Sequence, residues 1–210
     1  MALYAPGGVR RQPRSLATRQ ELVDAARMIF ARDGFENTRL EDIAAAAGKT
    51  RGAFYANFKD KEDVFFAIVE NDIARDGEVL LEGLMGVVSR EERLDILSRF
   101  LLTLLDDRPR MLLSFEFKLY AIRRPHRQKR LAALYAEMCV RCGEMHIDHL
   151  LPEFGQADPV RKRRKAAIFG SVMDGLVLNR LFQPGAMQEH EMLALIRAAI
   201  TVALERALEG

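Results

Sequence analysis

Residues 38–61, which read TRLEDIAAAAGKTRGAFYANFKDK, decide the fold of the N-terminal part of this chain. Apolar residues recur at helical spacing before Gly48, and Phe54 and Phe58 share one helical face after it. Thr50 can cap the helix that follows the turn at Gly48. Two short helices joined by a tight glycine-containing turn predict a helix-turn-helix.

A supporting helix precedes this pair. The sequence TRQE at 18–21 has the spacing of a capping box, and so has TRLE at 38–41, so we expect helices to begin at both places. Gly34 is placed to end the first of these helices in a left-handed conformation. Phe35 then reads as a core residue, and Asp60 as the cap of a fourth helix.

The rest of the chain also has helical spacing, and no stretch shows the sustained alternation of a strand. Prolines fall where helices tolerate them, in a first turn or just beyond an end. The sequence therefore predicts an all-α protein. The longer helices are expected at 61–85, 90–106, 110–123, 126–151, 159–182 and 188–208.

Composition excludes several classes. With 49% hydrophobic and 30% charged residues the chain should fold rather than stay disordered. No apolar run approaches the ~20 residues that span a bilayer, and the N-terminus lacks a secretory h-region, so we expect a cytoplasmic protein without membrane contact.

The net charge of +2 conceals an N-terminal excess of positive charge, because residues 1–61 hold 11 Lys and Arg against 7 Asp and Glu. Residues 1–17 read as a flexible basic arm with Arg10, Arg11 and Arg14.

The helix after Gly48 has the properties of a DNA-reading helix. Its outward face is basic, Gly52 and Ala53 allow close approach, and its N-terminus can meet a phosphate. A packed helical hairpin with no nucleic-acid partner has the same spacing. The basic arm has two readings as well, a minor-groove contact or a solvated tail.

The stretch 18–64 closely resembles the DNA-binding domain of TetR-family transcriptional regulators, in the pieces AARMIFARDGFENT and DIAAAAGKTRGAFYANFKDKED. The resemblance implies an N-terminal helix-turn-helix domain at 18–62 and a larger effector-binding and dimerisation domain at 63–210. It implies a ligand-responsive regulator, expected to be a repressor, that binds a palindromic operator as a homodimer. A small molecule in the C-terminal domain would release it.

Carried over to this sequence, the resemblance implies phosphate contacts on both flanks of the reading helix. Arg51 is the candidate for direct base readout, because its guanidinium matches the O6 and N7 acceptors of guanine, with another phosphate contact as the alternative. Lys49 and Asn57 depart from the usual family pattern. The expected DNA-binding residues are Thr38, Arg39, Lys49, Thr50, Arg51, Gly52, Tyr55, Asn57 and Lys61.

The larger domain supplies two further sets of residues. Flexible or flat apolar side chains predict an effector pocket, although residues of these types also fill ordinary cores. The expected pocket residues are Met85, Met111, Phe115, Tyr120, Tyr135 and Met138. The last two helices carry broad apolar faces, and the resemblance implies that they form the dimer interface through Phe169, Met173, Leu176, Val177, Leu195 and Ala199.

Other functions have less support. Cys139, Cys142, His146 and His149 lie near one helical face, which leaves a metal- or redox-responsive regulator open, although one helix cannot bring all four to one metal. No nucleophile elbow, P-loop or HExxH motif is present, so we expect neither an enzyme nor a cofactor, and we assign no metal site. A ligand-independent architectural DNA-binding protein stays an alternative.

Overall fold

The computed structural model describes residues 13–146 and 158–205, and every regular element in these two ranges is an α-helix. The prediction of an all-α fold is confirmed. In chain order the helices are α1 (Pro13–Asp33), α2 (Leu40–Ala46), α3 (Arg51–Tyr55), α4 (Lys61–Gly83), α5 (Arg90–Leu104), α6 (Arg108–Ile122), α7 (Pro125–His146), α9 (Pro159–Phe182) and α10 (Glu189–Glu205).

The chain forms two compact units, residues 1–69 and 70–210, and the division falls inside α4. The first unit contains α1, α2, α3 and the start of α4, with α2 packed against both α1 and α3. Phe35 is fully buried at its centre, with its ring centroid 5.0 Å from that of Phe30 and 5.9 Å from that of Phe65. Burial of each such ring stabilises the unit by about 2 kcal/mol, so the aromatic cluster fixes how α1 and α4 meet.

The turns of the first unit follow the sequence prediction. Gly34 ends α1 with φ of 80°, and Gly48 ends α2 with φ of 63°, a conformation that side chains with a Cβ rarely adopt. Thr50 caps α3, since its Oγ1 accepts a hydrogen bond from the Ala53 amide at 3.1 Å. Asp60 likewise accepts from the Asp63 amide at 2.9 Å in the first turn of α4.

Both predicted capping boxes are wrong. α1 begins at Pro13, whose fixed φ suits a first helical turn, so Thr18 lies inside the helix instead of at its end. The N-cap of α2 is Arg39, which makes no capping bond with its side chain. The hydroxyl of Thr38 donates instead to the Gly34 carbonyl at 2.7 Å, because the loop after α1 brings that acceptor within reach.

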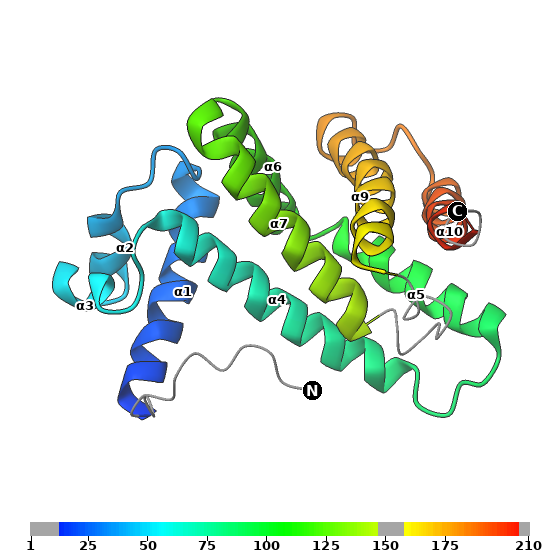
Figure 1. Cartoon of the computed structure of the whole chain (residues 1–210), viewed down its shortest axis with the longest axis horizontal. Helices are drawn as coiled ribbons and strands as arrows, with labels where there is room; N and C mark the ends of the chain where they lie inside the picture. The colour runs from blue at the N-terminus through cyan, green and yellow to red at the C-terminus, as the bar shows by residue number, and fades with distance from the viewer. Residues whose placement is uncertain (1–12, 147–157, 206–210) are drawn as a thin grey trace. The chain divides into compact units, whose positions relative to one another are not determined.

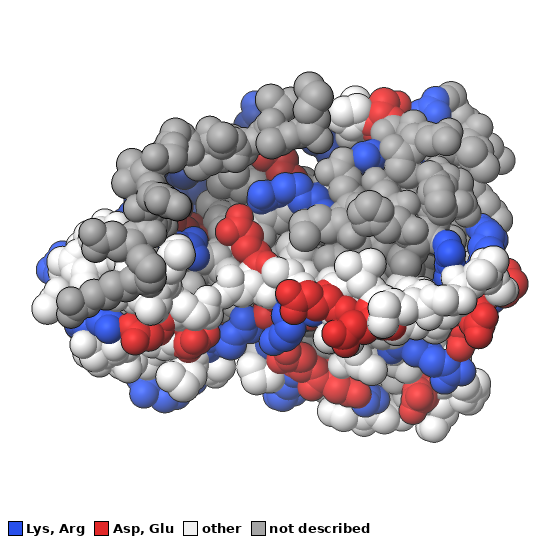
Figure 2. Space-filling view, turned by 90° about the horizontal axis from the view of Figure 1, so that it is seen from below, with Lys and Arg blue, Asp and Glu red and all other residues white. Residues whose placement is uncertain are grey.

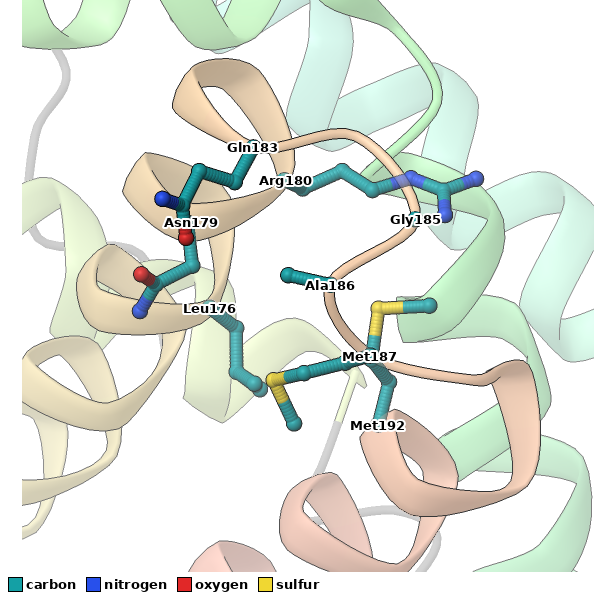
Figure 3. A pocket seen from close by; sticks show the side chains of 8 residues that line it. All are labelled: Leu176, Asn179, Arg180, Gln183, Gly185, Ala186, Met187 and Met192. Atoms are coloured by element: carbon teal, nitrogen blue, oxygen red, sulfur yellow. The ribbon is translucent and has the colours of Figure 1, made fainter.

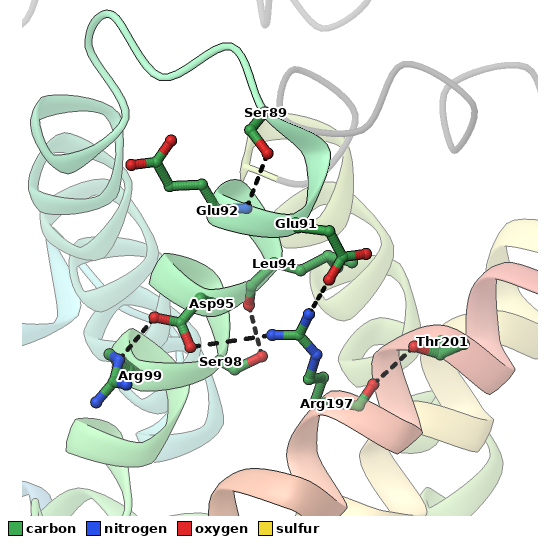
Figure 4. Close-up of polar contacts among 9 residues, drawn as sticks. All are labelled: Ser89, Glu91, Glu92, Leu94, Asp95, Ser98, Arg99, Arg197 and Thr201. Atoms are coloured by element: carbon green, nitrogen blue, oxygen red, sulfur yellow. Dashed lines mark hydrogen bonds and ion pairs between the residues drawn. The ribbon is translucent and has the colours of Figure 1, made fainter.

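The second unit is a layered helical bundle. α9 lies between α7 and α10 (Figure 1), α6 packs on α7, and α5 packs on α10. Leucines from α4 and α5 meet α9 and α10 in one apolar core, with Leu97 and Ile196 almost completely buried. At the edge of that core Arg197 of α10 pairs with Glu91 and Asp95 of α5 (Figure 4), so the last helix is fixed by apolar packing and by charge.

Candidate functional site

The exposed face of α3 is built on one buried anchor. Phe54 is fully buried, whereas Arg51, Gly52 and Tyr55 face solvent, with Tyr55 46% exposed. The guanidinium carbon of Arg51 lies 5.5 Å from the centre of the Tyr55 ring. The two side chains therefore form a single exposed surface that carries a cation and an aromatic ring.

Arg51 has an acidic neighbour on α2. Its Nη1 lies 3.2 Å from Oε1 of Glu41, and both side chains are at least half exposed. Hydrogen bonding to Tyr55, together with the charge of Glu41, raises the pKa of the Arg51 guanidinium. Since exposed ion pairs of this kind contribute little net stability, Arg51 can exchange Glu41 for another anion at small cost.

Gly52 is not required by packing within the chain. A Cβ built on Gly52 would meet only the Thr50 Oγ1 at 3.8 Å, which is an ordinary van der Waals contact. Its backbone also needs no left-handed conformation, because Gly52 lies in the first turn of α3. The absence of a side chain at this position leaves the backbone of α3 accessible from outside.

Two lysines near α3 are engaged within the first unit. Lys49 pairs with Glu21 at 2.6 Å, which joins the turn before α3 to α1. The ammonium of Lys61 donates to the carbonyls of Phe35 and Glu36 at 2.8 and 2.7 Å. Lys61 thus closes the loop after α1, a contact that its place in the sequence does not suggest.

The other residues predicted for this surface differ in exposure. Arg39 is exposed in the loop before α2. Thr38 is only 5% exposed, and its hydroxyl bond to Gly34 shapes that loop. Asn57, also expected on this surface, is half buried, and its side chain donates to the Ala53 carbonyl at 2.9 Å.

Within the described residues, the side chains predicted for the effector pocket lie partly at the surface and partly in the packed interior. Met85 is 78% exposed beyond the end of α4, so it lies on the surface. Tyr120 and Met138 are buried, and Met111 and Phe115 pack against the apolar core of the second unit. These side chains fill space between helices, as flexible and aromatic residues commonly do.

One small pocket lies elsewhere, between the end of α9 and the start of α10 (Figure 3). Its volume is about 10 Å³, which is roughly the room that one water molecule needs. It is lined by Leu176, Asn179, Arg180, Gln183, Gly185, Ala186, Met187 and Met192. None of the predicted effector residues is among them.

A charged network joins α4 to α6. Asp72 and Asp76 of α4 are buried, and Arg110 of α6 pairs with both, with Nη2 2.7 Å from Asp76 Oδ2 and Nε 3.6 Å from Asp72 Oδ2. Arg75 also approaches both carboxylates at 3.4 Å. The Nη1 of Arg110 is buried without a hydrogen-bond partner, so the network is incompletely satisfied. No local sequence pattern marks Asp76 and Arg110 as partners, because they lie 34 positions apart.

The residues predicted for the dimer interface fall into two groups. Leu176, Val177 and Ala199 are at most 5% exposed within a single chain, so their side chains belong to its own core and not to a surface. Phe169 and Met173 are half buried beside that core, and Leu195 is 44% exposed. Helical periodicity indicated the apolar faces of both helices, but it did not settle which of their residues face solvent. The exposed apolar residues on the two helices are Val160, Leu178, Phe182, Leu195 and Val202.

Part of the cysteine and histidine cluster can be placed. Cys139 is half buried in α7, where burial raises the pKa of its thiol, and a protonated thiol is a poor nucleophile. The side chains of Cys142 and His146, and all of His149, lie outside the described residues. Within the described part of the chain no three His, Cys, Asp or Glu side chains are grouped to hold a metal ion.

Surface charge is mixed on the face drawn in Figure 2, where acidic and basic side chains lie interspersed. The described residues of this face therefore form no extended region of positive charge that would attract a polyanion. None of the helices in the described ranges combines the length and low charge that a bilayer crossing requires.

The sequence matches two family models. Residues 22–68 match the model for bacterial regulatory proteins of the tetR family, and residues 90–205, more than half of the chain, match that of the BetI-type transcriptional repressor C-terminal domain. The chain belongs to the TetR family. Its helix-turn-helix is therefore the family's N-terminal domain, as the resemblance implied.

Named relatives agree with this assignment. The chain is 30% identical to the transcriptional regulator AcrR of Shigella flexneri, over 91% of this chain and 89% of AcrR. It is 38% identical to the transcriptional repressor AcnR of Corynebacterium glutamicum over 39% of this chain, and so spans about half, 46%, of AcnR. Among solved structures it resembles the multidrug binding protein EbrR complexed with ethidium, with a TM-score of 0.59, 23% identity and coverage of 87% of this chain and 98% of EbrR.

Proposed function

We propose that this TetR-family protein is a ligand-responsive transcriptional repressor, which binds a palindromic operator as a homodimer and leaves it when a small molecule binds the C-terminal domain. The observation that carries the proposal is the exposed surface of Arg51, Gly52 and Tyr55 on α3. Arg51 supplies a cation, Gly52 leaves the backbone accessible, and Tyr55 supplies an aromatic hydroxyl. These groups lie on one short capped helix and suit the major groove of DNA.

Each residue of this surface has a proposed role. Arg51 reads a guanine by two hydrogen bonds after releasing Glu41, and Thr50 and Gly52 lie next to base edges. Tyr55 and Arg39 contact phosphates on opposite flanks. Because Lys49 and Lys61 are held by Glu21 and by loop carbonyls, their contribution is the local positive charge and the placement of α3 against α1 and α4. Thr38 and Asn57 act in the same way, by shaping the loop before α2 and the end of α3.

The homodimer is proposed to form through the outer faces of α9 and α10. Leu178 and Phe182 lie one helical turn apart on α9 and are 55% and 78% exposed, and Leu195 and Val202 of α10 are 44% and 40% exposed. Large apolar side chains exposed together commonly mark an interaction surface. A two-fold dimer is also what a palindromic operator requires, since each half-site takes one recognition helix.

The effector is proposed to act through α4. This helix contributes Phe65 to the core of the first unit and Asp76 to the charged network with α6, so it belongs to both units. The bound ethidium of EbrR is evidence of small-molecule binding by that protein, and at 23% identity its likeness to this chain concerns the fold. A ligand that favours a different arrangement of α6 would bias α4 through Arg110, because coupling requires unequal affinity for two states.

Selection of bound duplexes from a random library tests the proposal. The full-length protein should enrich a palindrome whose half-sites lie about one helical turn, or a multiple of one, apart. Arg51→Ala serves as the matched variant and should lose one conserved base in each half-site. Recovery of unrelated sequences, with affinity set by salt alone, would leave only charge-driven association and reject the repressor function.

A further inference from the structure

The ammonium of Lys118 occupies a cage made by three helices. Lys118 of α6 donates to both carboxylate oxygens of Asp174 on α9, at 2.5 and 2.6 Å. The same nitrogen lies 5.0 Å from the centre of the Tyr135 ring on α7 and 5.7 Å from that of Phe115. We call Phe115, Tyr135 and Asp174 the ammonium cage. A carboxylate and two aromatic faces are the groups that proteins use to bind organic cations.

The walls of the cage are held in place. The Tyr135 hydroxyl lies 3.2 Å from the Ser114 hydroxyl, and its ring stacks on buried Phe117 with 6.3 Å between centroids. Burial raises the pKa of Tyr135, so the phenol stays neutral. Phe115 packs against the apolar core of the second unit. None of these rings can leave the site without disturbing that packing.

The resident cation, in contrast, can leave. Lys118 has a flexible four-carbon stem, and its side chain is 25% exposed, so the ammonium can move into water by rotation of its own torsions. Burial alone would lower the pKa of Lys118, but Tyr135 and Asp174 outweigh it, so the side chain stays charged in the cage. A partly buried ion pair gains little net free energy, because desolvation offsets the attraction. One ammonium can therefore replace another at low cost.

We propose that the ammonium cage is a recognition site for an organic ammonium ion, an amine or quaternary ammonium with apolar substituents, which displaces Lys118 from Asp174. The inference rests on the proposed function, in which the C-terminal domain binds the effector. An anion is not favoured, because it would have to displace Asp174 and lie against the electron-rich ring faces. Displacement breaks the ion pair between α6 and α9, on the helix that also carries Arg110.

Calorimetric titration of the full-length protein without DNA tests the site, with tetraethylammonium and benzyltrimethylammonium as probes and benzyl alcohol and benzoate as controls. Both cations should bind, and the two controls should not. Lys118→Met should tighten cation binding by about tenfold, because the resident competitor is gone. Asp174→Asn should abolish it. Asp106→Asn removes a different ion pair of α9, with Arg180 at 2.8 Å, and should leave cation affinity unchanged.

The outcomes separate the possibilities. Benzoate binding that is lost in Lys118→Met would make Lys118 an anion-binding group and overturn the proposal. Equal cation affinity in the wild type, Lys118→Met and Asp174→Asn would also overturn it, as would no cation binding to the wild type. If Lys118→Met does not fold, Lys118→Gln takes its place. The comparison of cation affinity between the wild type and Asp174→Asn then still supports or overturns the proposal. The titration contains no DNA, so it tests this site independently of operator binding. If the protein binds cations but selects no operator, only the repressor function is refuted. If it selects an operator but binds no cation, only this site is refuted.

Discussion

Arg110 of α6 donates from Nη2 to Oδ2 of Asp76 on α4 over 2.7 Å, and Oδ2 of a second buried carboxylate, Asp72, lies 3.6 Å from Nε of the same guanidinium. Two acids and one incompletely bonded arginine therefore hold these helices together in the second unit. Such a network is sensitive to the loss of Arg110, because the two buried carboxylates then lose the more buried of their two arginine partners, and Arg75 is 57% exposed.

Arg110→Met should lower the free energy of unfolding by about 3 kcal/mol, since Asp72 and Asp76 remain buried. Adding Asp76→Asn should recover part of that loss. Urea unfolding of the single and double variants measures both effects. Arg99→Met is the control, because it removes an exposed pair with Asp95 and should cause no measurable change. An equally harmless Arg110→Met would mean that the buried charges are hydrated.

The pair of Arg51 and Glu41 should control DNA affinity in opposite directions. Arg51→Ala should reduce discrimination at one base position by about tenfold, whereas Glu41→Gln should tighten binding, because it removes a negative charge that competes with the DNA. Fluorescence anisotropy with the selected operator and with duplexes substituted at single positions measures both. Uniform weakening across all sequences by Arg51→Ala would assign Arg51 to a phosphate.

The apolar face of α9 should be required for dimers. Leu178→Arg combined with Phe182→Arg places two cations on the proposed interface and should give monomers in sedimentation velocity, with much weaker operator binding. Met85→Arg provides a matched control, because Met85 and Phe182 are each 78% exposed. Dimers that survive the double substitution would place the interface elsewhere.

The N-cap of α9 should make stability depend on acid pH. Asp158 accepts hydrogen bonds from the Arg161 and Val160 amides, and the bond from Arg161 is the largest cause that lowers the pKa of Asp158. A lowered pKa stabilises the fold above the ordinary aspartate range, and that contribution is lost as the pH falls below about 4. Asp158→Asn keeps a capping oxygen but should flatten this part of the stability curve. Parallel curves for both proteins would contradict the assignment.

Local patterns predicted the helices and their caps well where one short segment settles the outcome. Thr50 caps α3 because its partner amide is three residues away. The failure at Thr38 has a local cause, since the Gly34 carbonyl, four residues earlier in the loop, accepts its hydroxyl. The 18–21 box failed for a local reason, because Pro13 starts the helix earlier.

Pairs between distant helices could not be predicted. Lys118 and Asp174 lie 56 positions apart, and neither has a flanking sequence that identifies the other. Periodicity predicted a broad apolar face on α9, yet the choice between Leu176 facing inward and Leu178 facing outward depends on where the other helices pack. The exposed surface of α3 was predictable, because the turn at Gly48 and the anchor Phe54 fix its orientation within a few residues.

The continuity of α4 sets a rule for engineering hybrid regulators. Val64 and Phe65 are buried near its start, and Asp72, Asp76 and Leu80 are buried further along the same helix. A graft joined at residue 69 would leave Val64 and Phe65 on one side of the junction and Asp72, Asp76 and Leu80 on the other. Inserting or deleting a single residue within α4 would turn the later part of the helix by about 100° and move it by about 1.5 Å. An exchange within α4 should therefore keep the number of residues in 61–83 unchanged, so that Asp72, Asp76 and Leu80 keep their partners in the second unit.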